Sequence, residues 1–319
     1  MLPALEYPQA DDEVAGLLHG AGERLLTSHD LRQRRLAALD LLLQGETGAA
    51  AAGDSGLRLQ SELLIRAHWA CGAQAHMSAA RRYLETVVAA FAAVVCALEV
   101  LDEPADGQAS DLALALLGES IELVRGLPEP LAPRLLAHWG ALWTRCAAAR
   151  TLDAALCAWP DLTVSQAIRV ATTSGLVTQW AVEAGAIVAD AAPELVGPLA
   201  DFGRYLGTAQ KLLHALSPGT HRWGDLRRLS GNLALAVAHD SGLAPTEPGA
   251  GVLDRDALRR RLTERDVPDY AWACADQCRR HAADALRRFA GAGGDPTPLA
   301  GLLDLPPELH FVQMEDAQP

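Results

Sequence analysis

The sequence predicts an all-α protein, a single-domain helical bundle. Alanine and leucine dominate, β-branched residues are sparse and aromatic residues make up 5% of the chain, a composition that favours helix almost everywhere. Alternation of apolar and polar residues at strand spacing does not persist over any useful window. Breaks fall at clusters of glycine and proline that leave long helices joined by short linkers, which favours one bundle of about ten or more helices.

Apolar residues at helical spacing define the predicted elements in order. The expected helices cover residues 11–27, 30–45, 57–74, 78–103, 108–125, 131–149, 163–191, 194–216, 224–241 and 254–290, and a short helix follows near 297–304. We expect residues 1–319 to form one domain, with 1–10 and 306–319 loosely ordered.

Charge and apolar runs narrow the functional classes. The formal net charge is -13, which argues against nucleic acid as a partner because phosphate backbones favour clustered lysine and arginine. No run of about 18 apolar residues is free of charge, so we predict no membrane span. No secretion signal is apparent, and the six cysteines lie mostly in apolar helical patterns, so we predict a cytoplasmic protein with reduced thiols.

The predicted helix 78–103 runs from an apolar stretch into an acidic end. Asp102 and Asp106 are four residues apart, so on a helix both carboxylates face the same way, and Glu103 lies beside them. Carboxylate oxygens at the end of a buried helix suit Mg²⁺, which takes one or two carboxylates plus substrate phosphates. The alternative is a solvated helix terminus, and Pro104 disfavours a helical Glu103.

Several segments resemble the trans-isoprenyl diphosphate synthases of the polyprenyl synthetase superfamily. The stretch 96–106 is similar to their first aspartate-rich motif, and 115–122 to the helix with a Gly-Asp pair, where Glu119 takes the acid position. In 168–176, Thr172 stands where that family has a lysine, and Thr173 matches its threonine. Gln210 matches the glutamine that precedes the second aspartate-rich motif. The resemblance implies a bundle around an apolar central cavity and Mg²⁺ bound by Asp102, Glu103 and Asp106.

The chain also departs from that pattern. Residues 213–217 read Leu-His-Ala-Leu-Ser where the family has its second acidic cluster, and Lys211 is the only lysine. The region 59–71, comparable to the isopentenyl diphosphate site, offers only Arg58 and Arg66 nearby. Arg222 with His221 could instead hold a diphosphate directly, and Asp225 could partly replace the lost acids. Ordinary chain elongation is therefore disfavoured.

Tryptophan is the commonest aromatic residue in the chain, and Trp180 follows Thr173 on the helix that lines the cavity in the family. An aromatic face there could stabilise a carbocation, whereas packing in the core is the alternative.

Two functions follow from the resemblance. The first is a specialised prenyltransferase or class I terpene synthase, with Thr173, Gln210, Glu119, Arg222, Asp225 and Trp180 as substrate-binding residues around a prenyl diphosphate held by Mg²⁺. The second is a catalytically degenerate homologue that acts as a regulatory subunit of an active synthase. The family precedent predicts a homodimer, or a heterodimer with a related synthase. A helical scaffold outside this family is a third possibility.

Overall fold

The computed structural model describes residues 14, 16–19, 55–72, 78–102, 107–157, 164–214 and 267–303. These residues form helices and short connecting turns, and no strand occurs within the ranges just given, which confirms the all-α class. None of the described helices is both long enough and apolar enough to cross a membrane.

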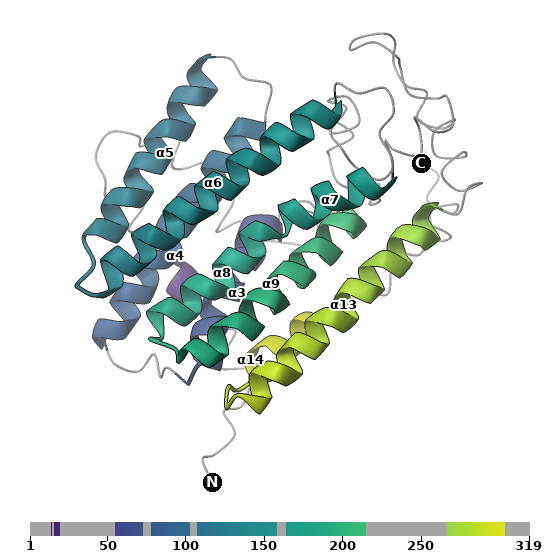
Figure 1. The fold of residues 1–319 in the computed structure, drawn as a ribbon. Coiled ribbons are helices and arrows are strands. Elements are labelled where there is room, and N and C mark those ends of the chain that lie inside the picture. Colours follow the sequence, from purple (N-terminus) through teal and green to yellow (C-terminus); the bar gives the residue numbers. More distant parts are fainter. Residues whose placement is uncertain are drawn as a thin grey trace, which may run out of the picture. The chain divides into compact units, whose positions relative to one another are not determined.

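The helices and their order are shown in Figure 1. They are α3 (Ser55–Ala70), α4 (Ser78–Asp102), α5 (Gly107–Arg125), α6 (Leu131–Cys157), α7 (Val164–Ser174), α8 (Leu176–Val188), α9 (Pro193–His214), α13 (Val267–Gly291) and α14 (Thr297–Ala300), followed by the 3₁₀ turn η2 (Gly301–Leu303). The predicted helices 30–45 and 224–241, most of 11–27 and the start of 254–290 lie outside the described residues.

Most predicted bounds in the described ranges agree with the structure to within a few residues, with two corrections. Helix α6 continues past residue 149 to Cys157, because no glycine or proline interrupts the chain there. The single helix predicted for 163–191 is wrong, because the helix is interrupted at Gly175 between α7 and α8. A Cβ atom at Gly175 would lie 2.7 Å from the carbonyl oxygen of Arg204, so only glycine permits this approach to α9.

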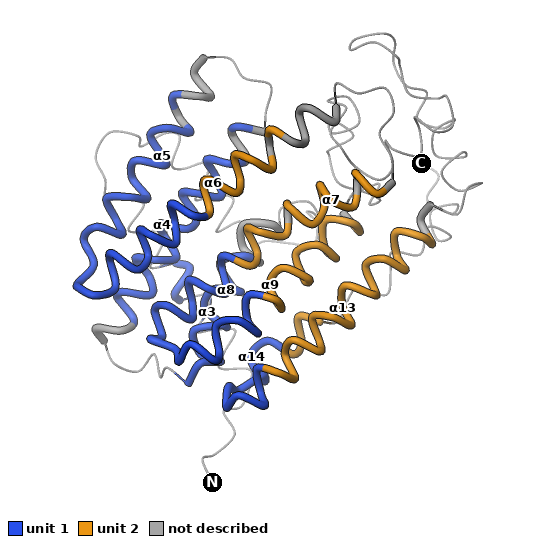
Figure 2. Tube along the Cα trace, viewed as in Figure 1, with its two compact units in different colours: residues 1–141, 180–200, 289–299 blue, residues 142–179, 201–288, 300–319 orange. Residues whose placement is uncertain are grey.

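The chain divides into two compact units, coloured separately in Figure 2. Unit 1 comprises residues 1–141, 180–200 and 289–299, and unit 2 comprises 142–179, 201–288 and 300–319. The prediction of one domain stays a prediction, and each unit is described by itself.

Helix α4 is the central element of unit 1. Its residues from Val87 to Ala97 are all buried, and α3 and α5 pack against it. Helix α8 contributes residues 180–188, and Gly185 allows it to approach α3 closely, since a Cβ atom there would lie 2.3 Å from the Leu64 carbonyl oxygen. A helix buried around most of its circumference matches the continuous apolar run of α4.

Unit 2 has a core of small and aliphatic side chains. Ala171, Ala209, Leu212, Leu213 and Ala275 are buried together, with two partly buried cysteines of α13 packed against them. Gly207 of α9 meets Thr178, where a Cβ atom on the glycine would lie 2.5 Å from the threonine Oγ1. Small residues at these positions let the helices approach closely.

Candidate functional site

Helix α4 ends at Asp102, the first residue of the predicted acidic motif. The apolar positions predicted from spacing are buried, and Phe91 and Val94 are fully inaccessible to solvent. The bounds of α4, Ser78–Asp102, match the predicted helix 78–103 to within one residue. Glu103, Asp106 and the side chain of Asp102 lie outside the described residues. The structure therefore brings a buried apolar helix up to the predicted metal-binding position.

Arg222 and Asp225, which follow α9 in the sequence, also lie outside the described residues. Glu119 is partly exposed on α5. Within the described ranges no group of three or more histidine, cysteine, aspartate or glutamate side chains is arranged to hold a metal ion. Magnesium binding at the acidic motif stays a prediction.

The two threonines of α7 use their hydroxyl groups within their own helix. Thr172 Oγ1 donates to the carbonyl oxygen of Ile168 at 2.9 Å, and Thr173 Oγ1 donates to that of Val170 at 2.7 Å. Both side chains are partly exposed. A diphosphate bound by Thr173 would need the hydroxyl proton, so the side chain would have to release Val170 first.

Helix α9 carries Leu213 at the position where the resemblance places the first acid of the second motif. Gln210 is partly exposed, but Leu213 is 5% exposed and packs in the core of unit 2. A leucine side chain offers no oxygen for a cation, and this one is buried. The leucine that replaces an acid of the family pattern is therefore a core residue of unit 2.

Trp180 lies in an aromatic cluster within unit 1. Its ring stacks on Phe91 with centroids 4.6 Å apart and meets Trp139 edge-on at 4.1 Å, while His138 stacks on it at 5.5 Å. Trp180 is 2% exposed, and its Nε1 has no hydrogen-bond partner among the described atoms. The ring belongs to the packed interior, and its role toward a substrate stays a prediction.

Sequence reasoning missed the buried histidine of α3. His68 is 1% exposed, and neither ring nitrogen makes a hydrogen bond in the described part of the chain. Burial lowers the pKa of His68 to about 4, although the nearby Gly185 backbone favours the protonated form. The neighbouring Ser61, seven residues earlier on the same face, is also buried without a partner for its hydroxyl group there. His68 follows Leu64 by four residues and so lies on the same helical face, which could have predicted its burial.

A second histidine contact lies beside the aromatic cluster. His138 Nε2 is 3.4 Å from Glu183 Oε2, and both side chains are less than one-fifth exposed. This contact joins α6 to α8 within unit 1, and it holds the His138 ring over Trp180.

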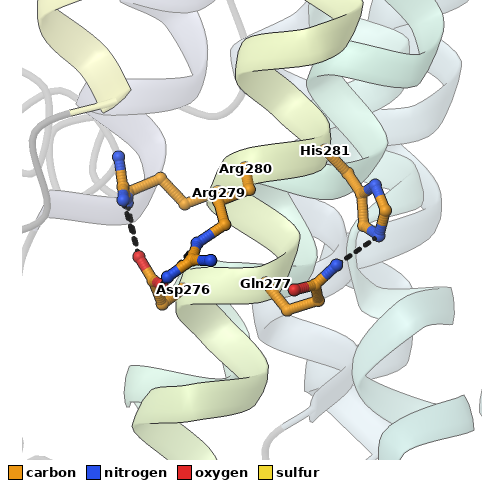
Figure 3. Close-up of polar contacts among 5 residues, drawn as sticks. All are labelled: Asp276, Gln277, Arg279, Arg280 and His281. Carbon is orange, nitrogen blue, oxygen red and sulfur yellow. Dashed lines mark hydrogen bonds and ion pairs between the residues drawn. The ribbon is translucent and has the colours of Figure 1, made fainter.

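Helix α13 of unit 2 carries a buried carboxylate that is paired with two arginines. Asp276 of α13 accepts hydrogen bonds from Arg279 and Arg280, as Figure 3 shows together with the contact between Gln277 and His281. The hydrogen bond from Arg279, helped by Arg280, lowers the pKa of Asp276 in spite of its burial. A carboxylate held by two guanidinium groups is a structural element and is not available to a metal ion.

Comparisons with known proteins identify the fold. No family model matches the sequence, and no curated protein matches it either. Among solved structures, geranylgeranyl pyrophosphate synthetase from the archaeon Geoglobus acetivorans is 17% identical, with a TM-score of 0.69 over 92% of this chain and 95% of that one. The decaprenyl diphosphate synthase from Rhodobacter capsulatus is 16% identical, with a TM-score of 0.69 over 93% and 94%.

The heptaprenyl diphosphate synthase from Staphylococcus aureus is 15% identical, and its TM-score is 0.65 over 94% of this chain and 98% of that one. These structures match nearly whole chains, so the likeness extends well beyond a shared motif. The chain therefore has the helical isoprenoid synthase fold of the trans-prenyl diphosphate synthases, as the resemblance of its motifs predicted.

Proposed function

We propose that this protein acts in isoprenoid metabolism by binding an allylic prenyl diphosphate through Mg²⁺ at Asp102, Glu103 and Asp106 and by promoting its ionisation. The observation that carries this proposal is a buried apolar helix, α4, that ends at Asp102 within the fold of the prenyl diphosphate synthases. The activity proposed is that of a specialised prenyltransferase or of a class I terpene synthase.

The chemistry of the donors fits the proposed ion. Three carboxylates provide hard oxygen ligands of the kind that Mg²⁺ binds together with phosphate oxygens. Magnesium bound there would neutralise charge on the diphosphate and so make it a better leaving group. The apolar surroundings of α4 would exclude water from the prenyl chain and from the allylic cation.

Ordinary chain elongation needs a second diphosphate site, and the described residues argue against one. Arg66 is one of two arginines near the region compared with the isopentenyl diphosphate site. Its guanidinium donates to Glu62 Oε1 at 2.6 Å and to the carbonyl oxygen of Pro298 at 3.2 Å. An arginine already held by a carboxylate is a poor ligand for a second diphosphate.

Leu213 supports the same restriction. Its burial in an apolar cluster of unit 2 leaves no acid at the start of the segment compared with the second motif, so fewer metal ligands are available. A diphosphate held by fewer metals ionises less readily, which disfavours repeated elongation.

A non-catalytic partner subunit is the second candidate, and the aromatic cluster favours it. Phe91, Trp139 and Trp180 occupy interior volume with mutual ring contacts. Bulky side chains of this kind leave less room for a prenyl chain. In this role the chain would bind an active synthase and shape the length of its product.

Release of diphosphate tests the proposal directly. The full chain is incubated with geranyl, farnesyl or geranylgeranyl diphosphate and Mg²⁺, with and without isopentenyl diphosphate. We expect release that requires Mg²⁺ and that falls roughly 100-fold or more in Asp102→Ala, because a metal ligand is lost. Asp269→Ala, which removes an exposed acid in the first turn of α13, is the matched control and should retain release.

The opposite result decides between the two candidates. If the wild-type chain releases no more diphosphate than Asp102→Ala under every condition, the enzymatic proposal is wrong. The chain is then added to an active prenyl diphosphate synthase and the product length is measured. An unchanged product distribution would exclude the partner-subunit role as well.

A further inference from the structure

Helix α13 carries two cysteines on one face. Cys274 and Cys278 are four residues apart, so their side chains are neighbours on successive turns of the helix. Both thiols are free, and both side chains are partly buried against the apolar core of unit 2. The chemistry proposed for the acidic motif does not use this pair.

The spacing of the two cysteines disfavours a disulfide and suits a bridging ion. Residues four apart on a helix have Cβ atoms roughly 5–6 Å apart. A disulfide needs about 3.5–4.5 Å between its Cβ atoms, so closing one here would distort the helix. An ion between the two sulfurs spans a wider gap, because two metal–sulfur bonds of roughly 2.3 Å take the place of one sulfur–sulfur bond.

The donors around the pair determine which ion fits. Among the described residues, no third histidine, cysteine, aspartate or glutamate completes a metal-binding group with the two thiols. His281 follows Cys278 by three residues, but its Nε2 lies 3.0 Å from Gln277 Nε2, as Figure 3 shows. Its ring also lies against Tyr205, with centroids 5.0 Å apart. The histidine is therefore engaged elsewhere on the surface of α13.

Two sulfur ligands favour a soft ion of low coordination number. Structural Zn²⁺ sites are almost always four-coordinate, so a pair of thiolates alone is a poor zinc site. Thiolates are soft ligands and select copper(I) over the hard divalent ions that carboxylates bind. The pair on α13 and the acidic motif at the end of α4 thus differ in the class of metal that their donors suit.

The surroundings of the pair suit a bound ion. The apolar cluster that includes Ala171, Leu212 and Leu213 packs against both cysteines, and such a shell limits the access of water to a metal. One turn before Cys274, the hydroxyl group of Tyr270 forms a hydrogen bond with the Cys274 side chain, which raises the pKa of Tyr270. A donor of this kind orients a ligating sulfur.

The protonation of the pair sets the balance of the binding step. Burial raises the pKa of Cys278, and the neighbouring Cys274 adds to the effect. Cys278 without a metal is therefore a thiol at neutral pH and a weak nucleophile. Binding of one copper(I) ion forms two copper–sulfur bonds and releases one proton from each thiol, with no change of oxidation state.

We propose that Cys274 and Cys278 bind one copper(I) ion between their sulfurs in linear coordination, with the Tyr270 hydroxyl orienting Cys274. The ion would join two successive turns of α13, and it would stabilise the folded chain by mass action. The proposal is independent of the magnesium chemistry proposed for the acidic motif.

Competition with bicinchoninate, a coloured copper(I) chelator, tests the site in the full chain under anaerobic, reducing conditions. We expect the chain to withdraw one copper(I) ion from the chelator. Cys274→Ser and Cys278→Ser should each weaken binding roughly 100-fold or more, because loss of a ligand costs at least as much as loss of a residue that orients one. Cys71→Ser is the matched control and should bind as the wild type does. Cys71 is a partly buried, free thiol on α3 with no cysteine within four residues of it.

X-ray absorption at the copper edge tests the geometry. The spectrum should show two sulfur neighbours and the sharp edge feature of linear copper(I). Tyr270→Phe should keep both sulfurs but weaken the affinity roughly tenfold, because the hydrogen bond that orients Cys274 is lost. Cysteines that serve only to pack the core would produce neither result.

Three outcomes would overturn the proposal. The wild-type chain could fail to compete with the chelator, or binding could persist unchanged in either cysteine variant. A spectrum with nitrogen or oxygen ligands would also exclude the two-sulfur site, and wild-type affinity in Tyr270→Phe would exclude the orienting role of the tyrosine. Circular dichroism verifies that each variant is folded, and Cys274→Ala or Cys278→Ala replaces a serine variant that unfolds.

Discussion

Units 1 and 2 treat buried polar groups in opposite ways. In unit 1, Gln60 Oε1, Ser61 Oγ, both ring nitrogens of His68 and Trp180 Nε1 are buried without a hydrogen-bond partner among the described atoms. In unit 2, the buried Thr208 Oγ1 donates to the carbonyl oxygen of Arg204 at 2.8 Å, and Asp276 is held by two arginines. Among the described atoms, unit 1 thus retains buried polar atoms that have no hydrogen-bond partner, whereas the two buried polar groups just named in unit 2 are both hydrogen-bonded.

The ends of two helices show the same contrast. In unit 1, α4 reaches an acid at Asp102, whereas in unit 2 α9 reaches the buried Leu213 at the position that the resemblance assigns to an acid. An unpaired buried polar group costs about 1–3 kcal/mol, so chains retain such groups where they serve another purpose. We infer that the described core of unit 2 is an apolar support, whereas the described core of unit 1 also retains unpaired polar atoms.

Among the tests of this comparison, Leu213→Asp should have the largest effect on the free energy of unfolding. The substitution places a carboxylate in the cluster of Ala209, Leu212 and Ala275, and it removes the aliphatic contacts of the leucine. We expect the free energy of unfolding to fall by about 5 kcal/mol, because a lost core side chain and a buried charge add. Urea denaturation followed by circular dichroism measures the loss.

Leu213→Met is the control for that experiment. It conserves volume and polarity, so it should cost less than about 1.5 kcal/mol. A contrary result would be that Leu213→Asp folds with nearly wild-type stability and binds additional Mg²⁺, measured by calorimetry. The end of α9 would then be able to form a metal site after a single substitution. Unit 2 would then not be an apolar support.

Trp180→Ala is the next largest test and probes the core of unit 1. The indole stacks on Phe91 and meets Trp139, so its loss should lower the free energy of unfolding by about 4 kcal/mol. Trp272→Ala is the matched control, since Trp272 is 45% exposed on α13 and should cost little. Trp180→Phe should be milder because it keeps a ring and removes the unpaired Nε1. Equal stabilities for the two alanine variants would contradict the packing role.

The core of unit 1 was predictable because its periodicity is local. Apolar residues recur every three or four positions along α4, so both the extent of the helix and the burial of Phe91 follow from spacing. The position of Asp102 at the end of that helix follows for the same reason. The break at Gly175 was not predictable, because it depends on the α9 backbone that lies opposite this glycine.

The partners of the candidate residues also depend on contacts that are distant in sequence. Trp180 meets Phe91 and Trp139, which come from two other helices, and no pattern near Trp180 indicates them. Thr173 matches a family motif, yet its hydroxyl is used by Val170 in its own helix. Motif spacing identifies which residue types are present, whereas burial and hydrogen bonding decide how each one is used.

The smallest expected effect concerns the pH dependence that the buried His68 gives to the stability of unit 1. Burial lowers the pKa of His68 from 6.5 to about 4, so the folded chain keeps the ring neutral where the unfolded chain takes up a proton. The contribution of His68 is fully present above pH 6.5 and is lost as the pH falls toward 4. A shift of this size corresponds to about 3 kcal/mol across that window.

Urea denaturation of the wild-type chain and of His68→Leu at several pH values from 4 to 7 measures this contribution. The leucine variant should lose the part of the pH dependence that His68 supplies, and it should also gain stability at low pH because an apolar side chain replaces two unpaired nitrogens. His281→Leu, at an exposed position of α13, should keep the wild-type pH dependence. If His68→Leu retains the full pH dependence, His68 is either protonated in the folded chain or bound to a partner group. Either result would contradict the assignment of His68 as a buried, unpaired polar residue of unit 1.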